Sequence, residues 1–391
     1  MDPATLERLI VREIRKATAI SRRDLADRLE VARSTAGRRV DSLIARGLLK
    51  ENGIEEKSEA GRPKRFLGIC GEFGRFVGFD FDARHVYAVL TDFAQSKISE
   101  RTVRLEAKPA KDEVLTILKE IIEEFRAECG EIKILGYGIG VPGRINQAEQ
   151  IGISYPYIEG WKDINLGKEL GLSSGELHIE NNTKAIALGE YWLGHDVPPE
   201  NLVCINIRTG ISTAILSNGH MLRGYHEMAG EIRGWKITGT DESVWLEDGA
   251  TVRSVLNKDS LTGWRAYVEA CLNGDDTALK TLNKLIPYHA DTVSRLVQLA
   301  DPEMVVIAGS FNDLGDTYLE PLRAATEEAL SNHYFAPPPV NFVSKGEFTG
   351  ALGAAALSAK CYKPDGTTVA ISSRKRARRR RVSKPRPSTA T

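Results

Sequence analysis

A cluster of polar side chains after an apolar run is where this sequence could carry out chemistry. The residues Ile179-Glu180-Asn181-Asn182-Thr183-Lys184-Ala185 lead into a helical pattern from Ile186 to Leu193. A strand end followed by a helix N-terminus can hold a small polar ligand beside backbone N–H groups. A general base would be a carboxylate or a His, but positions 181 to 184 offer two amides, a hydroxyl and an amine. The stretch therefore favours ligand recognition over proton abstraction.

The composition of the whole chain indicates a multidomain cytoplasmic protein. Its 391 residues exceed what one hydrophobic core usually serves, so two or three domains are expected. No run reaches the roughly 20 apolar residues that span a bilayer, and no signal-peptide pattern opens the chain. The five cysteines are far apart and form no C-x-x-C pair, which favours a reducing compartment and predicts neither disulfides nor a zinc site.

Charge is distributed unevenly along the chain, although the formal net charge is +0. Residues 1–65 carry 16 Lys and Arg against 11 Asp and Glu, and residues 371–391 carry nine against none. The remaining residues, 66–370, carry 28 basic against 42 acidic side chains. Basic ends around an acidic middle point to ends that meet a polyanion, although solvated surfaces would give the same composition. We expect residues 366–391 to be a disordered basic tail that strengthens DNA binding.

Residues 1–70 have the pattern of three short helices followed by two strands. Apolar residues at helical spacing predict a first helix ending near Thr18. Ser21 and Asp24 predict an N-cap for a second helix from Arg22 to Leu29, and a third helix ends at Arg46. Strands are expected at residues 48–50 and 65–69.

This order of elements predicts a winged helix-turn-helix that binds double-stranded DNA. The exposed face of the third helix and the tip of the wing would contact the duplex, the wing through the minor groove. A plain protein-interaction module is the alternative for three small helices with a basic face. The predicted DNA-binding residues are Arg33, Ser34, Thr35, Arg38, Arg39, Arg62 and Lys64.

From residue 76 the pattern changes to strands and helices that occur twice in similar order. Strands at 77–81, 86–90 and 98–105 precede a helix at 112–129, and a buried strand follows at 134–141. A similar order of elements begins again with strands at 202–207 and 211–216. Two tandem β-β-β-α units predict an α/β domain of two lobes with a cleft between them. We place the first lobe at residues 71–195 and the second at 196–365.

Five motifs in this order resemble the landmarks of the ROK family of repressors, open reading frames and kinases. They are Gly138 to Ile145, Trp161 to Leu166, Glu180 to Glu190, Ala229 to Ile232 and Gly350 to Ala355. The Gly61-Arg62-Pro63 segment ahead of them resembles the xylose-repressor branch of this family. The resemblance implies a two-lobed actin-like ATPase (ROK sugar-kinase-like) domain for the middle of the chain. It also implies that Asn181, Asn182, Glu231 and Glu247 bind the hydroxyls of a sugar or polyol effector.

The sequence departs from the family's kinases at the positions that carry catalysis and metal binding. The family's phosphate turn D-x-G-G-T is replaced by Asp80-Phe81-Asp82-Ala83-Arg84, and Asn182 stands where the family has its catalytic Asp. The zinc motif is missing, because the segment from Gly230 to Trp235 lacks its His and no Cys lies between Cys204 and Cys271. We therefore expect no catalytic residue, no cofactor and no metal.

Together these patterns predict a transcriptional regulator, a repressor, that binds DNA as a homodimer or higher homo-oligomer and senses a small sugar or polyol derivative. Two alternatives remain open at the level of sequence. One is an ATP-dependent sugar kinase with an appended DNA-binding domain. The other is a scaffold whose cleft is vestigial and senses nothing.

Overall fold

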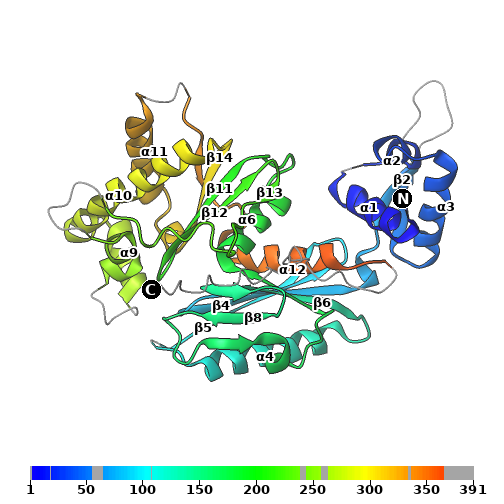
Figure 1. The fold of residues 1–391 in the computed structure, drawn as a ribbon, viewed down its shortest axis with the longest axis horizontal. Coiled ribbons are helices and arrows are strands. Elements are labelled where there is room, and N and C mark those ends of the chain that lie inside the picture. Colours follow the sequence, from blue (N-terminus) through cyan, green and yellow to red (C-terminus); the bar gives the residue numbers. More distant parts are fainter. Residues whose placement is uncertain are drawn as a thin grey trace, which may run out of the picture.

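The computed structural model describes residues 2–17, 19–54, 65–106, 108–237, 244–256, 263–332 and 336–364. Figure 1 shows an N-terminal helical module beside two larger lobes, each with a sheet at its centre. Within the described ranges no helix is both long and apolar enough to cross a bilayer.

The N-terminal module contains three helices and a two-stranded antiparallel sheet. Ser21 caps the second helix as predicted, because its hydroxyl accepts a hydrogen bond from the backbone N–H of Asp24 and the Asp24 carboxylate accepts from the N–H of Ser21. Apolar residues from all three helices are buried together. The elements are α1 (Pro3–Lys16), α2 (Arg22–Arg28), α3 (Arg33–Ala45), β1 (Leu49–Ile54) and β2 (Arg65–Ile69).

The first lobe is built on a five-stranded mixed sheet with strand order β10-β6-β3-β4-β5. β3 is buried along its whole length, as expected for a central strand covered on both faces. One face is covered by α4 (Lys111–Cys129), whose apolar stripe includes Leu118, Ile122 and Phe125. The strands of this sheet are β3 (Arg75–Phe81), β4 (His85–Asp92), β5 (Lys97–Arg104), β6 (Ile134–Val141) and β10 (Leu177–Asn181).

A small three-stranded sheet and one short helix complete this lobe toward the cleft. They are β7 (Arg144–Asn146), β8 (Ile151–Ser154), β9 (Lys162–Asn165) and α5 (Leu166–Leu170).

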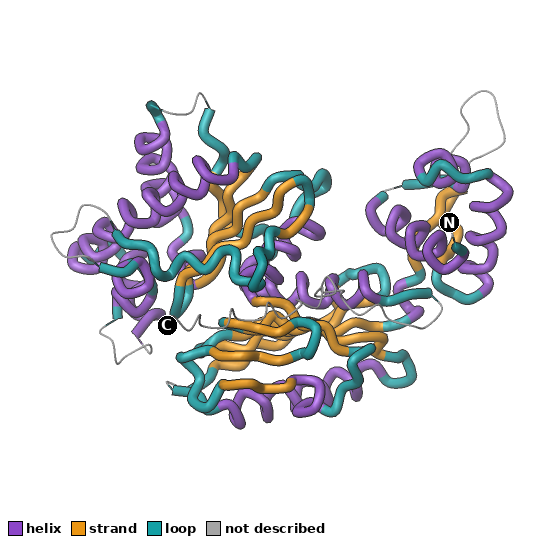
Figure 2. Tube along the Cα trace, viewed as in Figure 1, coloured by secondary structure: helices purple, strands orange, loops and turns teal. Residues whose placement is uncertain are grey.

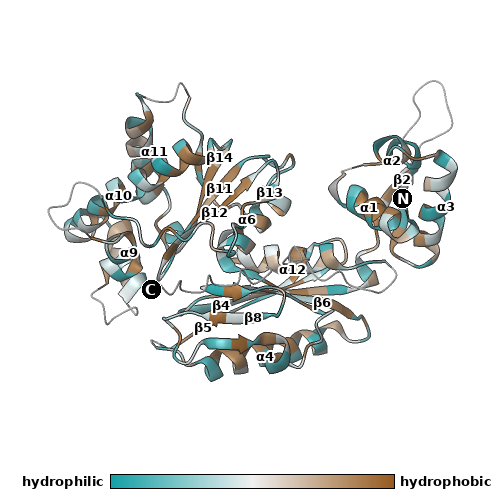
Figure 3. Ribbon diagram, viewed as in Figure 1, coloured by the Kyte–Doolittle hydropathy of each residue, from teal (hydrophilic) through white to brown (hydrophobic). Residues whose placement is uncertain are grey.

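The second lobe repeats the plan with strand order β13-β12-β11-β14-β15. Its strands are β11 (Leu202–Ile207), β12 (Ile211–Ser217), β13 (His220–Met221), β14 (Met304–Gly309) and β15 (Val340–Phe342). Its helices are α7 (Leu246–Gly249), α8 (Val252–Val255), α9 (Trp264–Leu272), α10 (Asp276–Ala300) and α11 (Asp316–Leu330). Figure 2 shows that the strands of the two sheets run in different directions, and Figure 3 shows hydrophobic colouring concentrated along these strands.

Two helices lie between the sheets and join the lobes. α6 (Asn182–Leu193) packs on α12 (Thr349–Cys361), and α12 also lies across β3 and β6. Gly138 in β6 permits this approach, because a Cβ there would lie 1.8 Å from the carbonyl oxygen of Ala354. The predicted two-lobed α/β arrangement is therefore present, with the polar stretch after Ile179 at its centre.

Candidate ligand-binding cleft

A cavity of about 670 Å³ lies between the lobes and contains all four residues predicted to bind an effector. Asn181 and Asn182 come from the junction of β10 and α6, whereas Glu231 and Glu247 come from the second lobe. Aromatic side chains of the first lobe, including Tyr155, Tyr157 and Trp161, form another part of the wall. A concave site lined by aromatic side chains and a few polar groups has the composition of a small-molecule site.

The two asparagines differ in how much of their hydrogen-bonding capacity is already used. Asn181 is the N-cap of α6: its Oδ1 accepts from the N–H of Lys184 at 3.2 Å, and its Nδ2 donates to the carbonyl of Gly143 at 3.0 Å. Asn182 accepts from the N–H of Thr183 at 2.9 Å, and its Nδ2 lies 3.4 Å from the carbonyl of Phe81. The second contact is long, so the amide N–H₂ of Asn182 is the freer of the two donors.

The two glutamates also differ in their partners. Glu247 accepts a hydrogen bond from the Tyr157 hydroxyl at 2.7 Å, and Arg253 donates to the same hydroxyl at 2.8 Å. The carboxylate of Glu231 forms no hydrogen bond or ion pair with the rest of the described chain. Burial raises the pKa of Glu231, and the nearby Arg233 cation opposes this. Glu231 is thus an acceptor that a ligand hydroxyl could satisfy.

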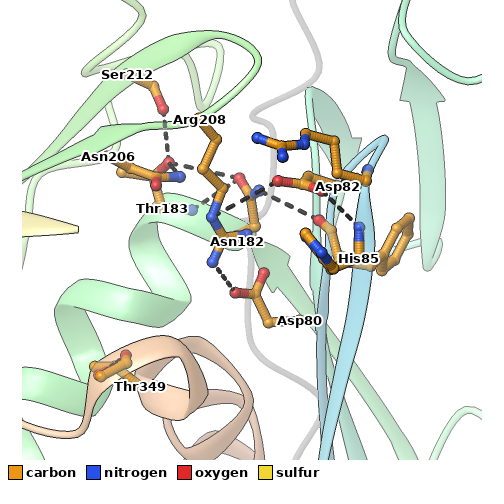
Figure 4. Close-up of polar contacts among 12 residues, drawn as sticks. Asp80, Asp82, His85, Asn182, Thr183, Asn206, Arg208, Ser212 and Thr349 are labelled. Carbon is orange, nitrogen blue, oxygen red and sulfur yellow. Dashed lines mark hydrogen bonds and ion pairs between the residues drawn. The ribbon is translucent and has the colours of Figure 1, made fainter. Parts of the chain in front are cut away.

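Beside Asn182, three charged residues from the two lobes pair with one another. We call Asp80, Asp82 and Arg208 the ion-paired cluster; Figure 4 shows Arg208 reaching toward both carboxylates. The Arg208 guanidinium lies 2.6 Å from Asp80 Oδ2 and 3.8 Å from Asp82 Oδ2. The Asp80 side chain is fully buried and Arg208 nearly so. Burial disfavours the Arg208 cation, but Asp80 and Asp82 outweigh it and raise its pKa. Burial also raises the pKa of Asp80 to about 6, and the Arg208 cation opposes this.

The ion-paired cluster occupies the region where the two hairpin turns, β3–β4 and β11–β12, approach each other. Asp82 fixes the first turn by accepting from the N–H groups of Arg84 at 2.7 Å and His85 at 3.0 Å. The N-terminal end of α12 also closes on Asp80, since a Cβ at Gly350 would lie 2.3 Å from its Oδ2. A nucleoside triphosphate would meet the Asp82 carboxylate there, at the position of the first glycine in the family's phosphate turn, and Arg208 is already paired. These residues do not fit ATP.

The residues after Glu231 do not fit a zinc ion. Among the residues that the structure describes, no group of three His, Cys, Asp or Glu side chains could hold a metal ion. Positions 238–243 lie outside these residues, and their sequence contains neither His nor Cys.

Further polar residues reach this region that the sequence did not assign to the ligand site. Thr183 Oγ1 lies 2.6 Å from Ser212 Oγ, and Asn206 Nδ2 donates to Thr183 at 3.1 Å, so α6 is tied to β11 and β12 (Figure 4). Glu180 is fully buried in an ion pair with Arg223. Arg208 could have been suspected, because an arginine in a turn between two apolar strands needs a carboxylate when it is buried.

The predicted DNA-binding residues of α3 occupy different environments. Arg33, Ser34 and Arg38 are exposed, although Arg33 lies 3.9 Å from Asp27. Thr35 is half-buried, and Arg39 turns inward to Glu7 of α1 at 3.6 Å. Arg62 and Lys64 lie outside the described residues.

Comparison with known proteins supports both the fold and the resemblance read from the sequence. A family model described as "ROK family" matches residues 76–238 and 248–360. The xylose repressor of Caldicellulosiruptor bescii is 25% identical over 343 residues, covering 81% of this chain and 85% of that protein.

Two solved structures give the same architecture. A ROK family transcriptional regulator described as a homolog of the E. coli MLC protein has a TM-score of 0.72 at 21% identity and covers 93% of this chain and 97% of its own. A ROK family glucokinase from Streptomyces griseus, solved with glucose and AMPPNP, has a TM-score of 0.62 at 21% identity and covers 73% of this chain and 99% of its own. The body of this chain therefore has the actin-like fold of ROK kinases, and the regulator matches the N-terminal region as well.

Proposed function

Because this chain belongs to the ROK family, we propose that it is a DNA-binding transcriptional repressor whose interlobe cleft binds a small sugar or polyol. The observation that carries the proposal is the contrast inside one cavity. The ion-paired cluster fills the nucleotide side, while Glu231 and Asn182 face the cavity with capacity for ligand hydroxyls. The likeness to a xylose repressor over most of both chains supports the same conclusion.

The N-terminal module would bind DNA as a winged helix-turn-helix. α2 and α3 would be the helix-turn-helix, with α3 in the major groove, and β1 and β2 would be the strands of the wing. Arg33, Ser34 and Arg38 are exposed on α3 and carry donors for phosphates and base edges. Arg39 is partly engaged by Glu7 and would contribute less. Arg62 and Lys64 would add contacts from the wing tip, and the basic tail would add salt-dependent affinity.

The cleft would recognise its effector without chemical change. Asn182 occupies the position from which a general base would act, and an amide can hold a hydroxyl but cannot deprotonate it. Asn181, Glu231 and Glu247 would complete the set of hydrogen-bonding groups around the ligand. The chain would accordingly work as a cytoplasmic regulator and not as an enzyme.

Effector binding would be coupled to DNA binding through the arrangement of the lobes in a homodimer or higher homo-oligomer. Two modules of such an assembly bind two half-sites, so their spacing decides the affinity for an operator. A ligand changes this affinity only if it binds the two arrangements unequally. Closure of the lobes on a sugar provides that difference.

The test begins with the DNA fragments that the protein retains from its own genome. On the selected fragment, Arg38→Ala should weaken binding by the roughly 1–3 kcal/mol of a base contact. Arg265→Ala is the matched control, because Arg265 is exposed on α9 in the second lobe. Equal affinities for Arg38→Ala, Arg33→Ala and the control would refute DNA recognition by α3.

The effector and the kinase alternative are tested together with a panel of sugars and polyols. D-xylose is the first member, because the Caldicellulosiruptor relative is a xylose repressor. We expect one member to change operator affinity and none to be phosphorylated with ATP. Steady ATP-dependent turnover of any sugar would overturn the regulator assignment in favour of a kinase.

A further inference from the structure

A second cavity, of about 500 Å³, lies where the N-terminal module meets the body of the protein. Its wall comes from α1, the turn between β4 and β5, and the C-terminal ends of α6 and α12. Figure 1 shows the module beside that end of α12. Apolar residues of α1, such as Ile10 and Ile14, belong to one buried cluster with Phe93 and Ala359 of the body. We call this space the junction cavity.

Among the described residues, the charged groups that line the junction cavity are all cationic. Arg8, Arg12 and Arg15 project from α1 and Lys360 from α12, and this described lining contains no Asp or Glu. Arg12 pairs with Glu13 on its own helix at 3.1 Å, while Arg8 forms no ion pair within the described part of the chain. Cations that share one cavity repel one another even where some have a carboxylate nearby, and an anion placed among them lowers that cost.

Arg15 is the most deeply placed of these cations. Its Nη2 donates to the carbonyl of Phe93 at 2.7 Å, and its guanidinium lies 5.2 Å from the Phe93 ring centroid. Its Nε is buried without a hydrogen-bond partner. Burial lowers the pKa of Arg15 to about 10, and Asp92 opposes this. A buried N–H without an acceptor is costly, so an anion that accepts from it would be bound favourably.

Aromatic rings supply the remaining walls of the junction cavity. They are Phe93, Tyr191, Trp192 and Tyr362. The Lys360 ammonium lies 3.6 Å from the Trp192 ring centroid, so positive charge and apolar surface are adjacent. A ligand that matches both would have an anionic head and an aromatic or alkyl body.

We propose that the junction cavity is a second ligand site, separate from the interlobe cleft, that binds a small organic anion with an aromatic or alkyl body. The basic residues 371–391 are poor occupants, because their nine Lys and Arg would meet four further cations. Because α1 belongs to the module and the other walls to the body, the occupant touches both. Its binding therefore stabilises their docked arrangement.

The test uses the full chain and 1-naphthalenesulfonate as the probe, with affinity measured by titration calorimetry. The neutral 1-naphthalenemethanol and the cationic 1-naphthylmethylammonium have the same aromatic body and serve as comparisons. We expect the sulfonate to bind at least about tenfold more tightly than either, and Arg8→Gln and Lys360→Gln each to weaken it about three- to tenfold. Arg265→Gln, which removes a cation elsewhere, should leave the affinity unchanged.

Two results would overturn the proposal: equal affinity for the three naphthalenes, or sulfonate binding that neither Arg8→Gln nor Lys360→Gln changes. If Arg8→Gln lowers the unfolding midpoint, the exposed Arg12→Gln replaces it. Saturating D-xylose should not displace the sulfonate, and Glu231→Gln should bind it normally. Since neither operator binding nor sugar binding is the readout, the proposal can fail while the repressor assignment stands, and the reverse.

Discussion

The two sides of the interlobe cleft contain similar polar groups but use them in opposite ways. On one side, Asp80 and Asp82 of the first lobe are paired with Arg208 of the second. Elsewhere in the cleft, Glu231 is half-buried and has no hydrogen-bond or ion-pair partner within the described residues. Paired charges contribute to holding the lobes in place and leave little for a ligand. An acceptor without a protein partner is available to a ligand hydroxyl. The same cavity thus contains a structural half and a recognition half.

The largest expected effect tests the structural half. Arg208→Met removes the cation between two buried carboxylates and should lower the free energy of unfolding by about 3–5 kcal/mol, measured by urea denaturation. Arg265→Met, at a side chain that is 89% exposed, should change it by less than about 0.5 kcal/mol. Adding Asp80→Leu to Arg208→Met should recover part of the loss. If Arg208→Met behaves like the control, the ion-paired cluster has no structural role.

The next effect tests the recognition half. Glu231→Gln removes an ionised acceptor, and because a hydrogen bond to a charged group contributes about 1.5–3 kcal/mol, the effector found in the sugar panel should bind about 10- to 100-fold more weakly. Stability at pH 7 should not fall, since burial disfavours the ionised form of Glu231 in the folded protein. A large loss of stability with unchanged affinity would reverse the assignment of the two halves.

A smaller effect comes from pH. The raised pKa of Glu231 means that it takes up a proton at a higher pH than an ordinary glutamate. Lowering the pH from neutral toward the ordinary glutamate range should therefore weaken effector binding, because the protonated carboxyl loses acceptor capacity. Calorimetric titration of the Glu231→Gln variant should show a flat profile over this range. An equal slope in the variant would assign the pH dependence to another group.

The smallest expected effect tests whether the structural half keeps ATP out of the cleft. Asn182→Asp restores a carboxylate at the position of a general base, yet we expect no ATP-dependent phosphorylation of the sugar panel. The reason is that Arg208 and Asp80 still occupy the nucleotide side. Measurable turnover in this variant, assayed by coupled ADP release, would mean that the ion-paired cluster opens to admit ATP.

Much of the fold follows from local sequence patterns. β6 and β11 have the predicted bounds, because a run of apolar residues flanked by turn residues identifies a buried strand. α6 begins at Asn182, four residues before the periodic pattern, since Asn181 caps the helix through the N–H of Lys184. Short polar residues such as Asn favour helix N-caps as well as turns, so a capping residue can be assigned to a loop from the sequence alone.

Only some of the residues that line the cleft could be predicted from the sequence. The resemblance drew attention to Asn181, Asn182, Glu231 and Glu247, which line one cavity. The pairing of Arg208 with Asp80 joins residues 128 positions apart, and that of Arg15 with Phe93 joins residues 78 apart. No periodicity encodes such contacts, because they depend on how the lobes and the module pack.

α12 has a mechanical consequence that follows from its two ends. Its N-terminal turn packs against Asp80, and its C-terminal end lies at the junction cavity, where Arg46 of the module donates to the carbonyl of Pro364. Its 13 residues make a rod of about 20 Å, with every residue but Lys360 buried. Because α12 is short and buried along its length, we expect it to move as a single body. It would then link the surroundings of Asp80 to the module, whose helix α3 carries Arg33 and Arg38.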